Sequence, residues 1–271
     1  MPLKVFGNQK RSHCFASARG ILNGELMGGD FVEPFLSKLC KKIEDTQVRP
    51  EENEALRCDI QEVYCYIRNR MRRGVEAQRE LACMEDLCRK KMLEMEMASA
   101  SAHSELPLAP TDIEYALGEF CDAFDIAAGT GGRRVEFRCS GDGRSLICAP
   151  EMLLKGTGFL IRKLMVEGFT AVSIRSQFTA DYFLIHLHGG FRRAQKSNPL
   201  IQTDRETAAA LSTARRHRGN LAHLLNGESV DPIVYIPRSL SATSPPPVLP
   251  DFSDYLCSRL SPVYTCLYDL N

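Results

Sequence analysis

The sequence lacks a membrane-length apolar run, a net charge and a secretory signal. No uninterrupted apolar stretch approaches the ~18 residues that a membrane-spanning helix needs. Lys plus Arg and Asp plus Glu both number 34, so no bulk positive field favours nucleic acid or an anionic membrane. The first residues, MPLKVFGNQKRSHC, lack the apolar core of a signal peptide. We therefore expect a protein that neither spans a membrane nor binds nucleic acid.

The cysteines are numerous but lack the spacing of a metal site. The chain has 11 of them, an odd count, with no Cys-x-x-Cys motif and no cysteine pair accompanied by a histidine pair at zinc-ligand spacing. No P-loop and no Ser/His/Asp or Cys/His nucleophile arrangement stands out either. Free cysteine commonly behaves as a small buried hydrophobic residue in a reducing compartment. We therefore expect a cytoplasmic protein with mostly buried thiols and no bound metal.

The N-terminal third has the periodicity of helices. Apolar residues recur at spacings of three and four from Pro50 to about Ala98, which favours a coiled-coil-like hairpin or one long helix. If there are two helices, Gly74 is the expected bend between them. Two shorter amphipathic helices are predicted over 10–27 and 31–46. So long an apolar seam needs a partner, which is either the shorter helices or a second copy of the chain.

Residues 111–238 predict a mixture of strands and helices. Short alternating apolar runs predict strands at RRVEFRC, SLICA, AVSIRSQF, DYFLIHLHG, NLAHLL and PIVYIP. Helical spacing covers residues 111–128, PEMLLKGTGFLIRKLM and RETAAALSTARRHRG. Thr111, with Glu114 three residues on, is expected to form a capping box for the first of these helices. Strands on one side and helices on the other make an α+β sandwich.

This order and spacing resemble the ATP-binding domain of histidine kinases and their relatives, the GHKL fold (named for gyrase, Hsp90, histidine kinase and MutL). The segment CAPEMLLKGTGFLIRKLM sits where the family places its nucleotide-binding helix. The segment ARRHRGNLAHLLNGESVDPIVYIP looks like the family's closing helix, turn and final strand pair. The resemblance implies an α+β chain in which an N-terminal helical hairpin or coiled-coil dimerisation region precedes a GHKL-type α/β sandwich.

The resemblance also suggests a division of the chain. It gives, in order, a helical dimerisation and phosphotransfer-like region, a linker (SASAHSELPLAP), a GHKL ATPase-like domain, and a Pro-rich linker with a C-terminal tail, at residues 1–98, 99–110, 111–238 and 239–271. The implied partners are a second copy of the chain, as a homodimer, and a response-regulator or kinase-like protein. The last segment, 251–271, is apolar enough either to fold back on the body or to contact a partner.

The departures from the family pattern concern the nucleotide site. Phe159 and Lys163 stand where the family helix carries the Asn that helps to hold magnesium. The family's Asp-x-Gly-x-Gly motif is reduced to Gly189-Gly190 with no Asp nearby, and residues 192–203 hold no glycine for a phosphate lid. Gly189-Gly190 is either a relic of that motif or a hairpin exit where glycine allows a positive φ. A metal–triphosphate site needs oxygen ligands and closely approaching backbone amides, and neither set is found.

These departures predict a degenerate GHKL domain without a cofactor. We expect a histidine-kinase-like signalling protein of a two-component phosphorelay that acts by dimerisation and partner binding. One alternative is a histidine phosphotransferase that uses His13, the sole histidine of the helical part, although the acid and the Arg-x-Pro that follow the family's acceptor histidine are missing. The other alternative is an active kinase that binds Mg-ATP in a divergent site.

Four further histidines carry weaker expectations. His186 and His188 alternate on one predicted strand and share a face, but no third metal ligand is visible near them in the sequence. A polar strand face is therefore the expectation for this pair. His217 and His223 flank Gly219 and are expected to be exposed residues of a turn.

Overall fold

The computed structural model describes residues 53–72, 78–101, 106–139, 145–192, 204–226 and 229–270, together with Lys41 and Ile43. The chain forms two compact units, residues 1–47 with 54–88 and residues 48–53 with 89–271. Several sequence expectations lie outside the described residues: the helices over 10–27 and 31–46 (apart from Lys41 and Ile43), the candidate phosphoacceptor His13, and the bend at Gly74.

The first unit contains helix α3 (Asn53–Arg72) and the start of helix α4 (Gln78–Ala100). The apolar seam is therefore carried by two helices, and the single-helix alternative is wrong. Leu56, Ile60 and Val63 of α3 are buried, at the spacings of four and three that place side chains on one helical face. Among the helices within the described ranges, none is both long and apolar enough to cross a membrane.

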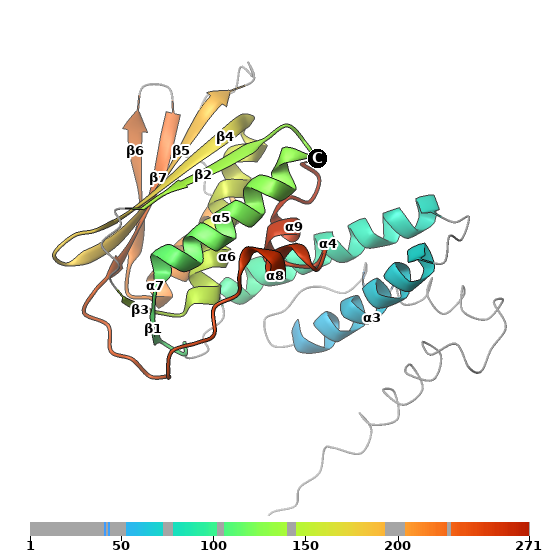
Figure 1. The fold of residues 1–271 in the computed structure, drawn as a ribbon, viewed down its shortest axis with the longest axis horizontal. Coiled ribbons are helices and arrows are strands. Elements are labelled where there is room, and N and C mark those ends of the chain that lie inside the picture. The colour runs from blue at the N-terminus through green and yellow to red at the C-terminus, as the bar shows by residue number, and fades with distance from the viewer. Residues whose placement is uncertain are drawn as a thin grey trace, which may run out of the picture. The chain divides into compact units, whose positions relative to one another are not determined.

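A five-stranded mixed sheet forms the centre of the second unit (Figure 1). The strand order is β2-β4-β5-β7-β6, in which β2 runs parallel to β4 and all other neighbours are antiparallel. Their bounds are Arg134–Arg138 for β2, Phe169–Phe178 for β4, Tyr182–Arg192 for β5, Asn220–Asn226 for β6 and Ser229–Pro237 for β7. The sequence predicted all five strands.

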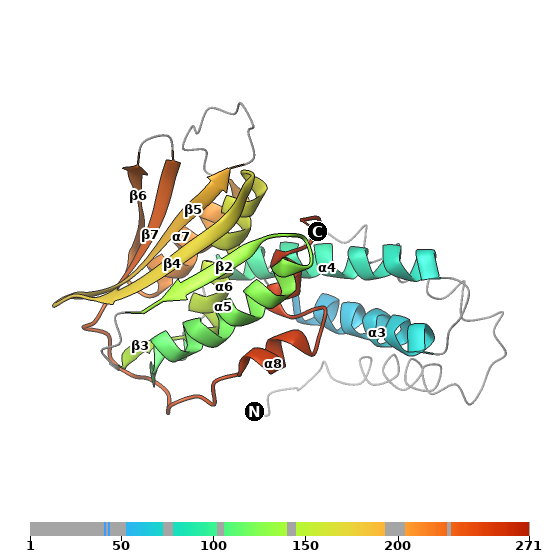
Figure 2. The same cartoon turned by 45° about the horizontal axis from the view of Figure 1, so that its top comes forward.

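Helices α5 (Ile113–Gly129), α6 (Pro150–Val166) and α7 (Arg205–Arg216) lie on one face of this sheet (Figures 1 and 2). Alternate strand residues point to opposite faces, so one set packs under the helices. That set is buried and includes Val172, Ile174, Ile185, Leu187, Val234 and Ile236. The α+β sandwich predicted from the sequence is confirmed.

The cap of helix α5 differs from the prediction. Thr111 belongs to the short strand β1 (Ala109–Thr111), and its hydroxyl donates to the carbonyl of Ala109. The N-cap is Asp112, whose carboxylate accepts the backbone N–H of Tyr115 at 3.1 Å. Glu114 instead accepts a hydrogen bond from the Ser176 hydroxyl at 2.6 Å. The predicted capping box is wrong because β1 extends through Thr111, where it pairs with strand β3 (Leu146–Cys148).

The C-terminal segment folds back on the second unit. Two short helices, α8 (Phe252–Leu256) and α9 (Pro262–Cys266), lie against α5 and α6. The ring of Tyr255 stands edge-on to that of Phe120 with 5.2 Å between centroids, and Val263, Cys266 and Leu267 are buried in the common core. The structure therefore shows the first of the two alternatives for this segment, in which it folds back on the body.

The cysteines divide evenly between core and surface. All nine within the described ranges are free thiols, of which four are buried, four exposed and one intermediate. Burial raises the pKa of the Cys148 and Cys266 thiols to about 12, so these two act as apolar core residues. The expectation of mostly buried thiols therefore fails for the exposed ones, which are Cys65, Cys83, Cys139 and Cys257.

Candidate functional site

The candidate site is the boundary between α6 and α7, because α6 is the helix that resembles the family's nucleotide-binding helix. Pro150 opens α6, at a position where its missing N–H costs nothing. Asp204 opens α7 as its N-cap, and its carboxylate accepts the backbone N–H of Thr207 at 2.7 Å. The two helices pack side by side in the second unit. Gly156 of α6 allows this close approach, since an added Cβ would lie 2.8 Å from the Thr213 methyl group.

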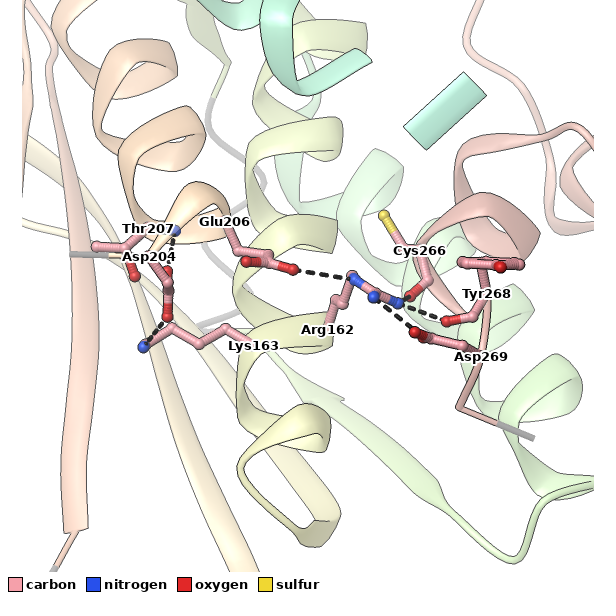
Figure 3. A network of polar contacts seen from close by, with 8 residues as sticks. All are labelled: Arg162, Lys163, Asp204, Glu206, Thr207, Cys266, Tyr268 and Asp269. Carbon is pink, nitrogen blue, oxygen red and sulfur yellow. Dashed lines mark hydrogen bonds and ion pairs between the residues drawn. The ribbon is translucent and has the colours of Figure 1, made fainter. Parts of the chain in front are cut away.

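Lys163 points from α6 toward the start of α7 (Figure 3). Its ammonium group donates to the carboxylate of Asp204 and forms an ion pair with Glu167 at 2.9 Å. Burial by itself would lower the pKa of Lys163, but hydrogen bonds to both carboxylates raise it above its usual value. Burial would raise the pKa of Asp204, yet the bonds from Lys163 and Thr207 hold it below its usual value. Both groups are therefore charged at neutral pH.

Arg162, the preceding residue, binds the C-terminal segment (Figure 3). Its guanidinium donates to the carbonyl oxygens of Cys266 and Tyr268 at 3.1 and 2.6 Å, and to the Asp269 carboxylate at 3.0 Å. The Nε atom donates to Glu206 of α7 at 3.1 Å. The side chain is 8% exposed, so the N–H donors of this guanidinium find their acceptors almost entirely within the protein.

Phe159, the other residue at the position of the family Asn, belongs to the core. It is 1% exposed and packs within the main apolar cluster. The acidic residue at the start of the helix, Glu151, forms an ion pair with Lys155 at 2.6 Å, and Lys155 also pairs with the buried Glu96 at 2.7 Å. The structure thus separates the two matching positions, with Phe159 inside the core and Lys163 at the α6–α7 boundary.

Gly189 and Gly190 lie in a strand and not in a turn. They lie within β5, opposite Val172 and Ala171 of β4, and positive φ occurs elsewhere among the described glycines, at Gly132 and Gly168. A Cβ added to Gly189 would lie 2.6 Å from the Phe169 ring, so this glycine is required by packing. The expectation of a hairpin exit is wrong, because β5 continues through both residues.

His217 and His223 also differ from expectation. His217 is fully buried, where it accepts the backbone N–H of Ala149 at Nε2 and donates from Nδ1 to the Thr213 carbonyl, at 3.0 and 2.8 Å. Burial lowers its pKa, which keeps the ring neutral. His223 is half-buried in β6. The prediction of two exposed turn residues is wrong, because His217 ties the end of α7 to the start of α6.

His186 and His188 share one strand face, as predicted, and a third residue joins them. Asp231 of β7 lies 2.9 Å from His188 Nδ1 and 3.6 Å from His186 Nε2. Sequence reasoning missed Asp231 because it lies 43 positions from His188. It also missed Arg162, Asp204 and Glu206, of which Asp204 carried a usable signal, since an aspartate before a helical run predicts an N-cap.

Comparison with known proteins adds a similarity of fold. No family model matches the chain, and no curated protein matches it. Solved structures do match: the crystal structure of full-length ShkA in complex with AMPPNP is 14% identical, with a TM-score of 0.51 over 73% of this chain and 47% of ShkA. Histidine kinase AdeS of Acinetobacter baumannii is 12% identical, with a TM-score of 0.43 over 84% of this chain and 98% of AdeS. The histidine kinase domain of the E. coli osmosensor EnvZ is 14% identical, with a TM-score of 0.37 over 53% of this chain and 96% of that domain.

The superposition with ShkA shows a similar fold, with a helix pair followed by a mixed sheet covered by helices. The strongest of the three superpositions, with ShkA, extends over nearly three quarters of this chain. The chain spans just under half of ShkA.

Proposed function

We propose that this chain is a signalling protein of a two-component phosphorelay that has a histidine-kinase-like fold, does not bind ATP, and acts by dimerisation and partner binding. The observation that carries this proposal is the ion-paired boundary between α6 and α7. On this proposal, the helix that holds nucleotide in the family has become a structural helix that joins α7 and the C-terminal segment.

The residues at this boundary do not fit Mg-ATP. Magnesium on a triphosphate is held through oxygen ligands, and α6 offers no carboxylate or amide side chain after Glu151 in its first turn. Gly189, the candidate relic of the glycine motif, has its Cβ position occupied by the Phe169 ring.

The charge of the boundary also opposes a triphosphate. The two cations, Lys163 and Arg162, contact four carboxylates, those of Glu167, Asp204, Glu206 and Asp269. An arriving polyanion would have to displace these carboxylates from the cations and would then face a local excess of negative charge. Separating the helices would in addition break the two ion pairs that join α6 to α7, which are Lys163 with Asp204 and Arg162 with Glu206.

The proposal of dimerisation and partner binding is based on the helical region. Its seam of apolar residues along α3 and α4 is typical of helices that pair with other helices. The partner that the fold similarity suggests is a response-regulator or kinase-like protein. Light scattering of the full chain tests the first part: a mass of two chains supports it, and a single-chain mass at all concentrations contradicts it.

Equilibrium dialysis with labelled ATP and magnesium tests the loss of nucleotide binding. The proposal predicts that the wild-type chain shows no saturable binding that substitutions on α6 weaken, and AMPPNP, the nucleotide present in the ShkA complex, serves as a non-hydrolysed second probe. Saturable binding of both nucleotides that is weakened by substitutions on α6 would contradict the proposal and would support the alternative of an active kinase with a divergent ATP site.

A further inference from the structure

The sheet face opposite the helices carries a hollow of about 230 Å³ lined by Ser173, Arg175, His186, His188 and Asp231. These residues come from the three neighbouring strands β4, β5 and β7. They alternate with the buried residues that pack under α5, α6 and α7, so they belong to the other face. We name this hollow the open-face pocket.

The strand register arranges the lining in two cross-strand rows. Ser173 of β4 lies opposite His188 of β5, and Arg175 lies opposite His186. On the outer side, β2 places Glu136 beside Ser173 and Arg138 beside Arg175.

Two arginines, Arg138 and Arg175, lie side by side near the pocket and differ in their surroundings. Arg138 is bound to Glu136 on its own strand at 2.7 Å, so these two neutralise each other. Arg175 is exposed at the rim of the pocket. The cationic side chain that both lines the pocket and reaches solvent is therefore Arg175.

Asp231 lies beneath the two histidines. Its side chain is 1% exposed, and its two carboxylate oxygens lie 2.9 and 3.1 Å from Nδ1 of His188. The carboxylate can only accept, so Nδ1 carries the proton and Nε2 is the ring nitrogen left for another partner. The His188 side chain is 44% exposed, so a ligand in the pocket can reach it.

This arrangement suits an oxyanion. Arg175 presents several N–H groups in a planar fork, Ser173 offers a hydroxyl, and an imidazolium at His188 donates from both nitrogens, one to Asp231 and one to the ligand. A cation in the pocket would be repelled by the positive charge of Arg175. In the part of the chain that the structure describes, no group of three or more His, Cys, Asp or Glu is arranged to hold a metal ion.

We propose that the open-face pocket binds a phosphate-class oxyanion, either orthophosphate or the phosphoryl group of a phosphomonoester, through Arg175, His188 and Ser173. A phosphate offers enough acceptor oxygens for donors that converge from two strands, whereas a single carboxylate offers two. The buried Asp231 positions His188 and balances its charge when the anion is bound. This site lies on the face away from α6 and α7, so the proposal does not depend on whether ATP binding has been lost.

Calorimetric titration of the full chain with sodium phosphate tests the proposal. We expect saturable binding by the wild type, at least tenfold weaker binding by Arg175→Gln and His188→Gln, and unchanged binding by Arg215→Gln. Arg215 is exposed on α7 and gives the same change of charge away from the pocket. Equal loss in Arg175→Gln and Arg215→Gln would show general charge attraction and would overturn the proposal, as would an absence of binding by the wild type.

Further titrations separate the sources of the anion and guard against misfolding. Glycerol phosphate that binds more tightly than orthophosphate identifies a phosphomonoester site, and the reverse identifies a site for the free ion. Phosphate binding that requires added Zn²⁺ and disappears with EDTA would overturn the proposal in favour of a metal site. Should His188→Gln fail to fold, the ring signals of His188 in the wild type are followed by NMR instead, and phosphate must shift them.

Discussion

Lys163 of α6 donates to the carboxylate of Asp204, the same carboxylate that caps the first turn of α7. One side chain therefore both starts a helix and fixes that helix to its neighbour. This relationship couples the formation of α7 to its packing on α6, and it places a paired lysine where the family resemblance predicts a nucleotide-binding position.

Two substitutions of Asp204 separate its capping role from its pairing role. Asp204→Ala removes both, and we expect it to lower the free energy of unfolding by about 2 kcal/mol. Asp204→Asn keeps a side-chain oxygen for the Thr207 N–H and loses the charge, so we expect a loss of about 1 kcal/mol. Urea unfolding followed by circular dichroism measures both. Equal losses would show that the cap contributes nothing, and an unchanged stability of Asp204→Asn would show the same of the ion pair.

Arg162 is predicted to hold the C-terminal segment on the body. Arg162→Met removes four hydrogen bonds, leaves the Cys266 and Tyr268 carbonyls and the Glu206 carboxylate without this partner, and should cost about 3 kcal/mol. Limited proteolysis should then cleave after residue 240 faster than in the wild type. Arg205→Met, an exposed arginine on α7, is the matched control and should leave the cleavage rate unchanged. Cleavage of the Arg162→Met segment at the wild-type rate would contradict this role.

Adjacent glycines in β5 should respond differently to the same substitution. In Gly189→Ala the new methyl would lie 2.6 Å from the Phe169 ring, and displacing that ring should cost about 2 kcal/mol. In Gly190→Ala the methyl would lie 3.8 Å from the Ala171 Cβ, an ordinary contact, so stability should change little. Thermal unfolding of both variants checks this. Similar behaviour of the pair would argue against the packing role of Gly189.

His217 should make stability depend on pH. Its pKa is lowered in the folded state, so the folded ring stays neutral while the unfolded chain takes up a proton below about pH 6.5. The stability that His217 contributes is therefore full above pH 6.5 and is lost progressively as the pH falls below it. The difference in unfolding free energy between wild type and His217→Gln isolates this contribution, because all other groups cancel. A difference that is constant from pH 8 to pH 5 would refute the assignment.

The sheet and its covering helices could be predicted from the sequence because they depend on local periodicity. The alternation in DYFLIHLHG is enough to place Ile185 and Leu187 on the buried face of β5, and the spacing in α6 is enough to predict a helix. The same reasoning placed His186 and His188 on a shared face.

The contacts at the candidate site could not be predicted in this way, because they join residues far apart in the chain. Arg162 and Cys266 are separated by 104 positions, and His217 and Ala149 by 68. Whether an arginine or a histidine is exposed depends on which distant backbone groups lie near it once the sheet has formed. No periodicity carries that information, and so His217 was expected at the surface.

A thermal-shift titration with Mg-ATP tests the central claim most directly, because a ligand that binds the folded state raises its melting temperature. The titration is made on the wild type and on Arg175→Gln, so that a phosphate contact at the open-face pocket is not mistaken for a nucleotide site between α6 and α7. We predict that the melting temperature of Arg175→Gln stays constant up to millimolar Mg-ATP. A concentration-dependent rise in that variant would contradict the loss of ATP binding.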